Sequence, residues 1–269
     1  MALPEPADGS TALVTGASSG IGAAIAAELA RRGHGVTLVA RREERLRELA
    51  DALAAEHGVH AEVIAADLGD RAARDRVATR VEELGRAVEI LVNNAGFGAN
   101  GTVDELDRER QVEMVELNCA ALLDLQVRYS PGMVERGRGA VINVASMAAF
   151  QPIPGTATYA ATKAFALSLS ESTHSELAEH GVTVTALCPG PVKTEFVEVA
   201  GVEGSEENLP GIFWASAEEV ARAAVAGADR GKRVVVPGGL MNRAGALTGQ
   251  HAPRMVALPL VKRLWRSNT

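Results

Sequence analysis

Three side chains in the middle of the chain have the types and the spacing that reduction of a carbonyl group requires. Ser146 precedes Tyr159 by thirteen positions, and Lys163 follows Tyr159 by four. When a hydride reaches a carbonyl carbon, charge builds up on the oxygen, and a phenol can donate a proton there if its ordinary pKa of about 10 is lowered. Residues i and i+4 share one face of a helix, so a helix over 158–179 would let the Lys163 ammonium stabilise the tyrosinate. Ser146 would hold the carbonyl oxygen.

A Tyr-x-x-x-Lys pair also arises by chance in long chains, so its meaning depends on the elements that position it. Short runs of Val, Ile, Leu and Ala alternate with longer segments of helical period. This alternation is typical of βαβ units and a parallel sheet. We expect strands near residues 11–15, 35–40, 61–66, 88–92, 139–145, 182–187 and 233–236.

The predicted fold is α/β, a doubly wound parallel sheet of Rossmann type with about seven strands and helices on both faces. Right-handed crossovers bring the carboxyl ends of the strands to one ligand-binding edge. The length of 269 residues and the hydrophobic content of 47% suit a single domain spanning residues 1–269. The connection at 195–215, rich in Glu and Gly, is long enough to predict a substrate flap, and 240–269 forms a C-terminal extension.

Composition argues against several classes of function. The net charge of −7 and the lack of a basic block disfavour nucleic acid as a partner. No apolar run is long enough to span a bilayer, and the first ten residues do not resemble a signal peptide. Cys119, Cys188 and the six histidines lack metal-ligand spacing, so we expect no metal site. A cytoplasmic location is the default expectation.

A glycine-rich turn follows the first predicted strand directly and opens a helical pattern. Gly16, Gly20 and Gly22 permit a tight turn and a close approach of the backbone to a pyrophosphate, with helix N–H groups facing the anion. A glycine turn alone could be no more than a tight turn. Its place between a first strand and a first helix indicates nucleotide binding.

The motifs, taken in order, resemble the short-chain dehydrogenase/reductase family over about residues 10–240. They are Thr15 to Gly22, Asp67-Leu68, Asn93 to Gly96, Asn118, Ser146, Tyr159 to Lys163, and Pro189 to Thr194. The resemblance implies that the catalytic residues are Asn118, Ser146, Tyr159 and Lys163.

In that family the tyrosine is the general acid in reduction and the base in oxidation, and the lysine also bonds the nicotinamide ribose. The position of Asn118, within a predicted helix from Glu109 to Arg128, supplies a backbone carbonyl that positions a water. A helix-interior Asn making only a local bond is the alternative for Asn118. Asn93 and Asn94 could likewise be no more than a turn after a strand.

The resemblance also implies a dinucleotide site. Its residues would contact the adenine, the phosphates and the nicotinamide amide. They are Gly16, Ser18, Ser19, Gly20, Ile21, Gly22, Arg41, Arg42, Asp67, Leu68, Asn94, Ala95, Gly96, Tyr159, Lys163, Pro189, Gly190, Val192 and Thr194.

The end of the second strand predicts NADP(H) rather than NAD(H). Val39-Ala40-Arg41-Arg42 stands where an acidic residue would bind a ribose hydroxyl pair. Arg41 can instead form charge-assisted bonds to the 2′-phosphate. The alternative is that Arg41, Arg42 and Arg45 merely begin a solvated helix, and Arg42 fits that alternative better than Arg41.

The substrate is expected to be a small neutral ketone, aldehyde or alcohol. The residues around the predicted site are mostly small or apolar, and the acidic flap, with Glu195 and Glu198, disfavours polyanionic substrates. Flap residues such as Phe196 and Trp214 could equally be core or subunit contacts. Steroid-like or fatty substrates and a non-catalytic NADP(H) sensor are the alternatives, whereas a sugar-nucleotide epimerase or lyase would need a larger carboxyl-terminal domain.

Two further expectations concern surfaces. The resemblance implies a homodimer or homotetramer paired through helices around 104–128 and 158–179, with Leu122, Leu125, Phe165 and Leu169 on their exposed faces. The tail after Gly239 mixes basic and apolar residues. We expect it to cover the substrate pocket or a neighbouring subunit rather than to contact a membrane.

Overall fold

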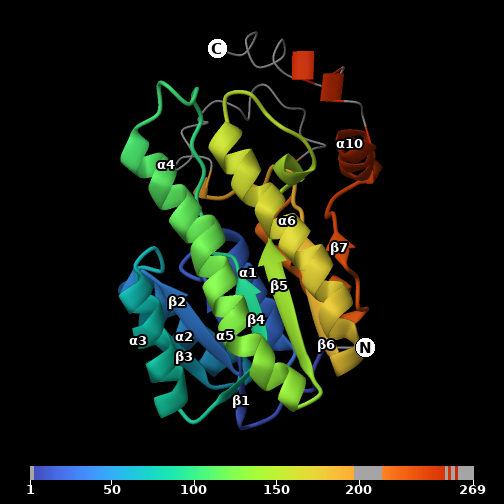
Figure 1. Cartoon of the computed structure of the whole chain (residues 1–269). Helices are drawn as coiled ribbons and strands as arrows, with labels where there is room; N and C mark the ends of the chain where they lie inside the picture. Colours follow the sequence, from blue (N-terminus) through green and yellow to red (C-terminus); the bar gives the residue numbers. More distant parts are fainter. Residues whose placement is uncertain (1–2, 197–213, 252–253, 256–257, 260–269) are drawn as a thin grey trace.

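Seven parallel strands form one sheet in the order β3-β2-β1-β4-β5-β6-β7 (Figure 1). The computed structural model describes residues 3–196, 214–251, 254–255 and 258–259. Each expected strand is confirmed, with ends that differ from the prediction by one residue at most. The strands are β1 (Ser10–Thr15), β2 (Val36–Ala40), β3 (Ala61–Ala65), β4 (Ala87–Asn93), β5 (Gly139–Val144), β6 (Val182–Leu187) and β7 (Val234–Val235).

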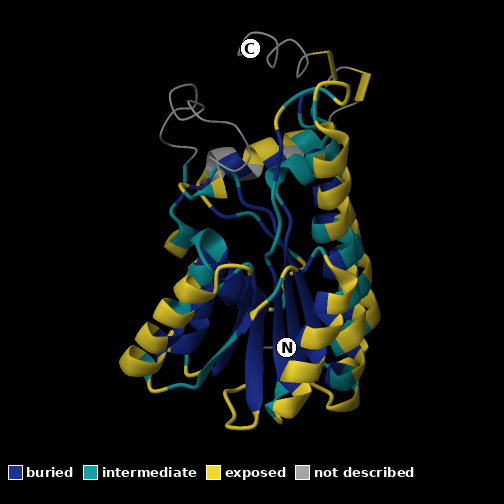
Figure 2. Cartoon of the chain, turned by 90° about the vertical axis from the view of Figure 1, so that its left-hand side faces the viewer, coloured by how far each residue is buried: buried dark blue, intermediate teal, exposed yellow. Residues whose placement is uncertain are grey.

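Helices cover both faces of the sheet, and Figure 2 shows the strands buried between them. Successive side chains on a strand point to opposite faces, so Val14 packs with the cluster under α1, α2 and α9, and Leu13 with the cluster under α3 and α5. Both faces are therefore apolar, which explains the continuous Val/Ile/Leu runs. The helices are α1 (Gly20–Arg31), α2 (Glu43–His57), α3 (Arg71–Glu83), α4 (Arg108–Val115), α5 (Leu122–Glu135), α6 (Ala157–Leu177), α9 (Ala217–Asp229) and α10 (Leu240–His251).

Short helical segments complete the fold: a π-helical segment, η1 (Glu116–Ala121), and the 3₁₀ turns η2 (Met147–Phe150) and η3 (Ala178–His180). The expected regular helix from Glu109 to Arg128 is wrong in this respect, because η1 interrupts it between α4 and α5. Within η1, Asn118 turns inward and bonds to groups outside its own helix. Periodicity cannot reveal this, because the wider turn is fixed by partners elsewhere in the chain.

The expected subunit faces also need correction. Leu122 and Leu125 are buried within the chain at 6% and 1% exposure, since they pack in the core under α5. Phe165 is exposed as expected, and Leu169 is partly buried. The apolar side chains that α4 and α5 do expose lie on the opposite face: Val112, Val115, Leu123 and Val127.

The first part of the C-terminal extension lies over η2. Gly245 approaches the Met147 side chain and Gly249 approaches Phe150, at distances that leave no room for larger residues without adjustment. Because η2 begins directly after Ser146, α10 lies near the predicted catalytic serine. Within the described residues, no helix is long and apolar enough to cross a membrane. Most of the segment 195–215 and the end of the extension lie outside the described residues.

Candidate active site

One cavity of about 630 Å³ opens at the carboxyl edge of the sheet. Residues from the ends of β1, β2, β4, β5 and β6 and from α6 line it, as expected for ligands of a doubly wound sheet. Of the residues predicted for the site, all but Gly22 and Asn118 line this cavity. The lining also includes residues not predicted for the site's cofactor or catalytic roles, among them Leu117, Met147, Glu195, Phe196 and Trp214.

The glycine turn is held against the end of β4 by a set of short hydrogen bonds. Thr15 Oγ1 accepts from the Asn94 and Ala95 N–H groups at 2.9 and 3.0 Å, and Asn94 Nδ2 donates to the Thr15 and Gly16 carbonyls at 3.0 and 3.2 Å. A Cβ on Gly22 would lie 2.4 Å from Asn94 Nδ2 and from the Gly16 carbonyl oxygen. Asn94 therefore does more than form a local turn, and Gly22 is required for close packing although it does not face the cavity.

Asn93 has a different role. Its Nδ2 donates to the Asn143 side-chain oxygen at 2.9 Å and to the Leu122 carbonyl at 3.3 Å, all within the buried layer under α5. Asn143 continues the chain of bonds to Gln126 and Ser170. These bonds join β4 and β5 to the helices that cover them, so Asn93 supports the site from the core.

Three of the four catalytic candidates, Ser146, Tyr159 and Lys163, meet at the end of β5. Ser146 Oγ accepts from the Ala148 N–H at 3.1 Å, and Lys163 Nζ donates to the Val144 carbonyl at 2.8 Å. Nζ lies 5.8 Å from the centre of the Tyr159 ring. Ser146, Tyr159 and Lys163 all face the same cavity, and Lys163 is 6% exposed.

The electrostatics of this group differ from the simple expectation. Burial raises the pKa of Tyr159 to about 12, opposed by a hydrogen bond to Ser146, although the phenol side is open to the cavity. Burial also lowers the pKa of Lys163 to about 8. The expected lowering of the tyrosine pKa by Lys163 is therefore not seen in this structure, because desolvation is the dominant effect and Nζ bonds to the Val144 carbonyl.

Asn118 links two walls of the site. Its Nδ2 donates to the Phe97 carbonyl and to Thr162 Oγ1, each at 3.0 Å, and its Oδ1 accepts from the Phe97 N–H at 3.1 Å. A Cβ on Gly96 would lie 2.7 Å from that Oδ1. These contacts exclude the alternative of a purely local helix bond. A water held by the Asn118 backbone carbonyl stays a prediction.

The two arginines at the end of β2 both line the cavity but have different partners. Arg41 is largely exposed, with Nη1 4.0 Å from the Asp67 carboxylate. Arg42 turns back over the glycine turn, where Nη2 donates to Ser18 Oγ at 3.0 Å and to Ser19 Oγ at 2.7 Å. Arg42 does precede α2 as its N-cap residue, and its guanidinium in addition contacts the predicted phosphate cradle.

Glu195 neutralises part of this charge. Its carboxylate accepts from Arg42 Nη1 at 2.7 Å and from Arg45, and these bonds lower the pKa of Glu195 to about 2. Sequence analysis counted Glu195 only among the acids of the flap. Its proximity to Arg42 could not be inferred from spacing, because 153 positions separate the two residues.

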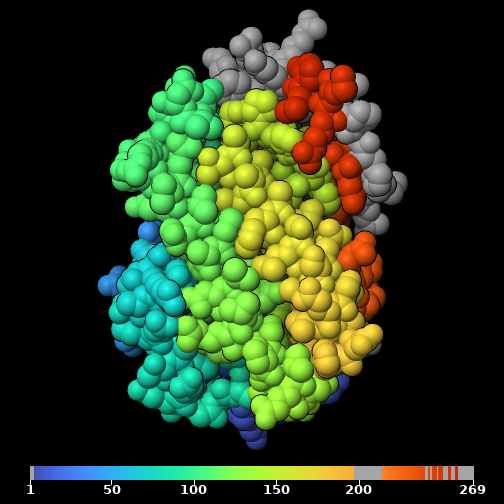
Figure 3. Space-filling view, in the orientation of Figure 1, coloured from blue at the N-terminus to red at the C-terminus, as the bar shows by residue number. Residues whose placement is uncertain are grey.

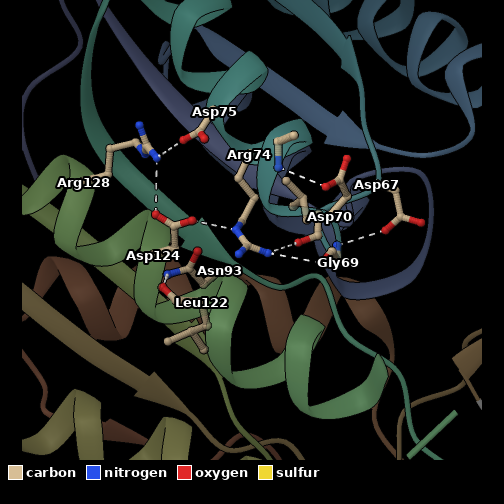
Figure 4. Close-up of polar contacts among 11 residues, drawn as sticks. Asp67, Gly69, Asp70, Arg74, Asp75, Asn93, Leu122, Asp124 and Arg128 are labelled. Atoms are coloured by element: carbon tan, nitrogen blue, oxygen red, sulfur yellow. Dashed lines mark hydrogen bonds and ion pairs between the residues drawn. The ribbon is translucent and has the colours of Figure 1, made fainter. Parts of the chain in front are cut away.

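A buried arginine holds the loop after β3, as Figure 4 shows. Arg74 on α3 donates to the Asp124 carboxylate at 2.6 Å and to the Leu68 carbonyl at 2.8 Å. Asp67 accepts from the Gly69 N–H at 3.0 Å, which closes the turn. Asp67 and Leu68 line the cavity. Their loop is thus fixed to α5 by a guanidinium that is 5% exposed in its side chain.

Part of the cavity lining is apolar. Phe97, Met147, Phe196 and Trp214 line it, and the Phe196 ring lies 5.6 Å from that of Tyr159. Arg110 stacks on the Phe97 ring, with the guanidinium carbon 4.6 Å from the ring centre. Such a lining suits an uncharged organic substrate better than a polyanion.

The comparisons with known proteins identify the family. The family model described as "short chain dehydrogenase" matches residues 10–202. The chain belongs to the short-chain dehydrogenase family. It is therefore an oxidoreductase that acts on carbonyl and alcohol groups with a nicotinamide dinucleotide.

Similar proteins include two solved structures. A short-chain dehydrogenase from Sphingobium yanoikuyae in complex with NADPH is 39% identical with a TM-score of 0.80, covering 89% of this chain and 92% of its own. The bulky-bulky ketone specific alcohol dehydrogenase from Comamonas testosteroni is 32% identical with a TM-score of 0.76, covering 98% and 96%.

A curated relative is longer than this chain. The very-long-chain 3-oxoacyl-CoA reductase of Anas platyrhynchos is 34% identical over 200 residues. The match covers 72% of this chain and 64% of that protein. The match therefore leaves about a third of that protein outside it.

The residues of the cavity fit a dinucleotide. The turn from Gly16 to Gly20 takes positive φ values of 64° and 57°, which glycine adopts without strain. The N-terminus of α1 faces the same cavity, where its N–H groups favour an anion. No group of three or more metal-ligating side chains occurs within the described part of the chain.

The pKa of Lys163 predicts a pH dependence of dinucleotide binding. The ammonium form is present below pH 8 and is lost as the pH rises through about 8. Its attraction for the negatively charged dinucleotide is lost with it. We expect NADH affinity, measured by fluorescence titration, to fall between about pH 7 and about pH 9, where arginines keep their charge.

Lys163→Met is the control for this dependence. It should bind NADH more weakly than the wild type at pH 7, and its affinity should change little over the same range. An equally steep decline in Lys163→Met would assign the dependence to another group.

Proposed function

We propose that this protein is an NADP(H)-dependent oxidoreductase that interconverts a small neutral ketone or aldehyde and its alcohol. One observation carries the proposal: Ser146, Tyr159 and Lys163 face the same cavity as the glycine turn and the arginines at the end of β2. A substrate carbonyl beside the apolar side chains of the cavity would lie near both the proton donor and the nicotinamide. NADPH supplies the hydride when bound.

Tyr159 donates the proton to the substrate oxygen in reduction and accepts it in oxidation. Its raised pKa keeps the phenol protonated before the reaction, which suits a proton donor. Charge that develops on the phenol oxygen is stabilised by Lys163, whose ammonium is fixed against Val144. Ser146 holds the substrate oxygen, and its backbone position is fixed where η2 begins.

The other proposed residues bind the dinucleotide. Ser18, Ser19, Ile21 and the glycines of the turn surround the pyrophosphate, and Asp67 and Leu68 contact the adenine. Asn94, Ala95 and Gly96 form one wall, and Pro189, Gly190, Val192 and Thr194 lie beside the nicotinamide. The arrangement of these residues around one cavity supports the assignment.

The proposed substrate class is based on the apolar part of the cavity lining. Phe97, Met147, Phe196 and Trp214 offer apolar contacts, and Glu195 adds negative charge near the entrance. The similar alcohol dehydrogenase that is specific for bulky ketones supports a neutral carbonyl. Steroid-like or fatty substrates fit the same lining and are the second candidate. The intact catalytic group weighs against a sensor that binds NADP(H) without turnover.

Removing the phenol oxygen separates binding from catalysis. We expect Tyr159→Phe to bind NADPH with nearly wild-type affinity and to lose at least about 10² in turnover, the low end for a positioned acid. Lys163→Ala should lose both turnover and affinity. Fluorescence titration and single-turnover reduction measure the two effects, and nearly wild-type turnover in Tyr159→Phe would rule out the mechanism.

Cofactor preference tests the two arginines separately. We expect Arg41→Ala and Arg42→Ala each to weaken NADPH binding by about 1.5 to 3 kcal/mol, because each removes a charge-assisted bond to the 2′-phosphate. NADH binding should change little. Arg47→Ala is the matched control, since Arg47 pairs with Glu43 on the same helix. Equal losses of affinity for NADPH and NADH would contradict the assignment of these arginines to the 2′-phosphate.

We propose that copies of the chain associate through α4, α5 and α6, which lie side by side on one face (Figure 3). The exposed apolar side chains Val112, Val115, Leu123, Val127 and Phe165 support this proposal. Sedimentation equilibrium should show a dimer or tetramer, and Val127→Glu should shift it toward the monomer. A wild type that is monomeric at micromolar concentration would contradict this proposal.

We also propose that the protein is located in the cytoplasm.

A further inference from the structure

The Glu195 carboxylate is paired with two arginines beside the cavity. Glu195 accepts a hydrogen bond from Arg42 at 2.7 Å through one oxygen and a bond from Arg45 through the other. Nε and Nη2 of Arg42 bond to Ser18 and Ser19. Side chains from the glycine turn, from α2 and its start, and from the segment after β6 thus converge at one point.

The donors at this point suit a phosphate monoester. Two guanidinium groups and two hydroxyls offer charged and neutral donors within a small volume, and guanidinium groups match phosphate oxygens in geometry. The site is partly exposed, with side-chain exposures of 44% for Arg42 and 50% for Arg45, and Arg42 and Glu195 also line the cavity, so a ligand can reach the site. In this structure the Glu195 carboxylate takes the place of such an anion.

The segment that carries Glu195 also lies along the cavity. A Cβ on Gly20 would be 3.1 Å from the Thr194 side chain, so Thr194 lies directly over the glycine turn. On the other side of Glu195, the Phe196 ring lies 5.6 Å from that of Tyr159. Residues 194–196 therefore extend from the arginines toward the catalytic tyrosine, and the bond to Arg42 helps to hold them there.

We propose that Glu195 is a specificity-determining residue that competes with the 2′-phosphate of NADP(H) for Arg42 and Arg45. The inference rests on the proposed preference for NADP(H). Two anions cannot share these guanidinium groups without repulsion, so NADP(H) binds only as the carboxylate withdraws. NAD(H) has no phosphate at this position and leaves the carboxylate in place. Glu195 therefore lowers the affinity of the protein for NADP(H). It also narrows the difference in affinity between NADP(H) and NAD(H).

The test is Glu195→Gln in the full-length protein, because glutamine keeps the size of the side chain and removes its charge. Fluorescence titrations with NADPH and NADH measure both affinities. We expect the Kd for NADPH to fall about tenfold, as removal of one charge close to a phosphate implies. The Kd for NADH should change less than about twofold, because NADH lacks the repelled group.

A matched control separates this effect from general charge. Glu43→Gln removes one negative charge from α2, but Glu43 contacts Arg47 rather than Arg42 or Arg45. It should leave the Kd for NADPH within about twofold of the wild type. Titrations with adenosine 2′,5′-bisphosphate and with AMP show whether the change in affinity depends on the 2′-phosphate. Only the bisphosphate should bind more tightly to Glu195→Gln than to the wild type.

The outcomes distinguish the two proposals. An NADPH affinity that is unchanged or weaker in Glu195→Gln would overturn the inference, the weaker affinity showing that Glu195 orients the arginines for the phosphate. The same gain in Glu43→Gln would also overturn it. A wild type that binds NADPH no more tightly than NADH would instead contradict the proposed cofactor preference, whatever the variants do.

Discussion

The site depends on the crevice between β1 and β4, where the order of strands along the sheet changes direction. β1 lies between β2 and β4, so the connections on either side of it leave in opposite directions and open a space at the carboxyl edge. Thr15 and Asn94 hold the two strand ends together through side-chain bonds to backbone groups. Without them the glycine turn would have no fixed wall opposite it. Every proposed contact to the dinucleotide is built around this junction.

The second constraint is the burial of charge at the end of β5. Lys163 is almost enclosed, which favours its neutral form, and the Val144 carbonyl offers only partial compensation. An anionic ligand beside Nζ would favour the ammonium again. The same enclosure holds Tyr159 in its protonated form. Desolvation thus keeps the proposed proton donor protonated and weakens the charge of Lys163 in the absence of an anion, and burying this charge costs some stability of the folded chain.

Polar residues in the core connect these two regions. Asn93, Asn143, Gln126 and Ser170 form a buried chain of hydrogen bonds under α5 and α6. Asn118 joins the loop after β4 to Thr162, one residue before Lys163. Because buried polar groups are costly unless they are paired, each bond fixes the orientation of its neighbours. The helix that carries Tyr159 and Lys163, α6, is therefore positioned by polar as well as apolar contacts.

The sequence by itself determined the strands and the glycine turn and indicated the proposed catalytic group, because apolar runs, glycine spacing and an i,i+4 pair are encoded within a few neighbouring residues. Tertiary structure decided the rest. It interrupted the helix around Asn118, buried Leu122 and Leu125 in the core, and turned Arg42 toward Ser18 and Ser19. Above all it brought Glu195 to Arg42 across 153 positions. Such contacts follow from how the elements pack, and no local pattern of residues records which distant charge will lie opposite.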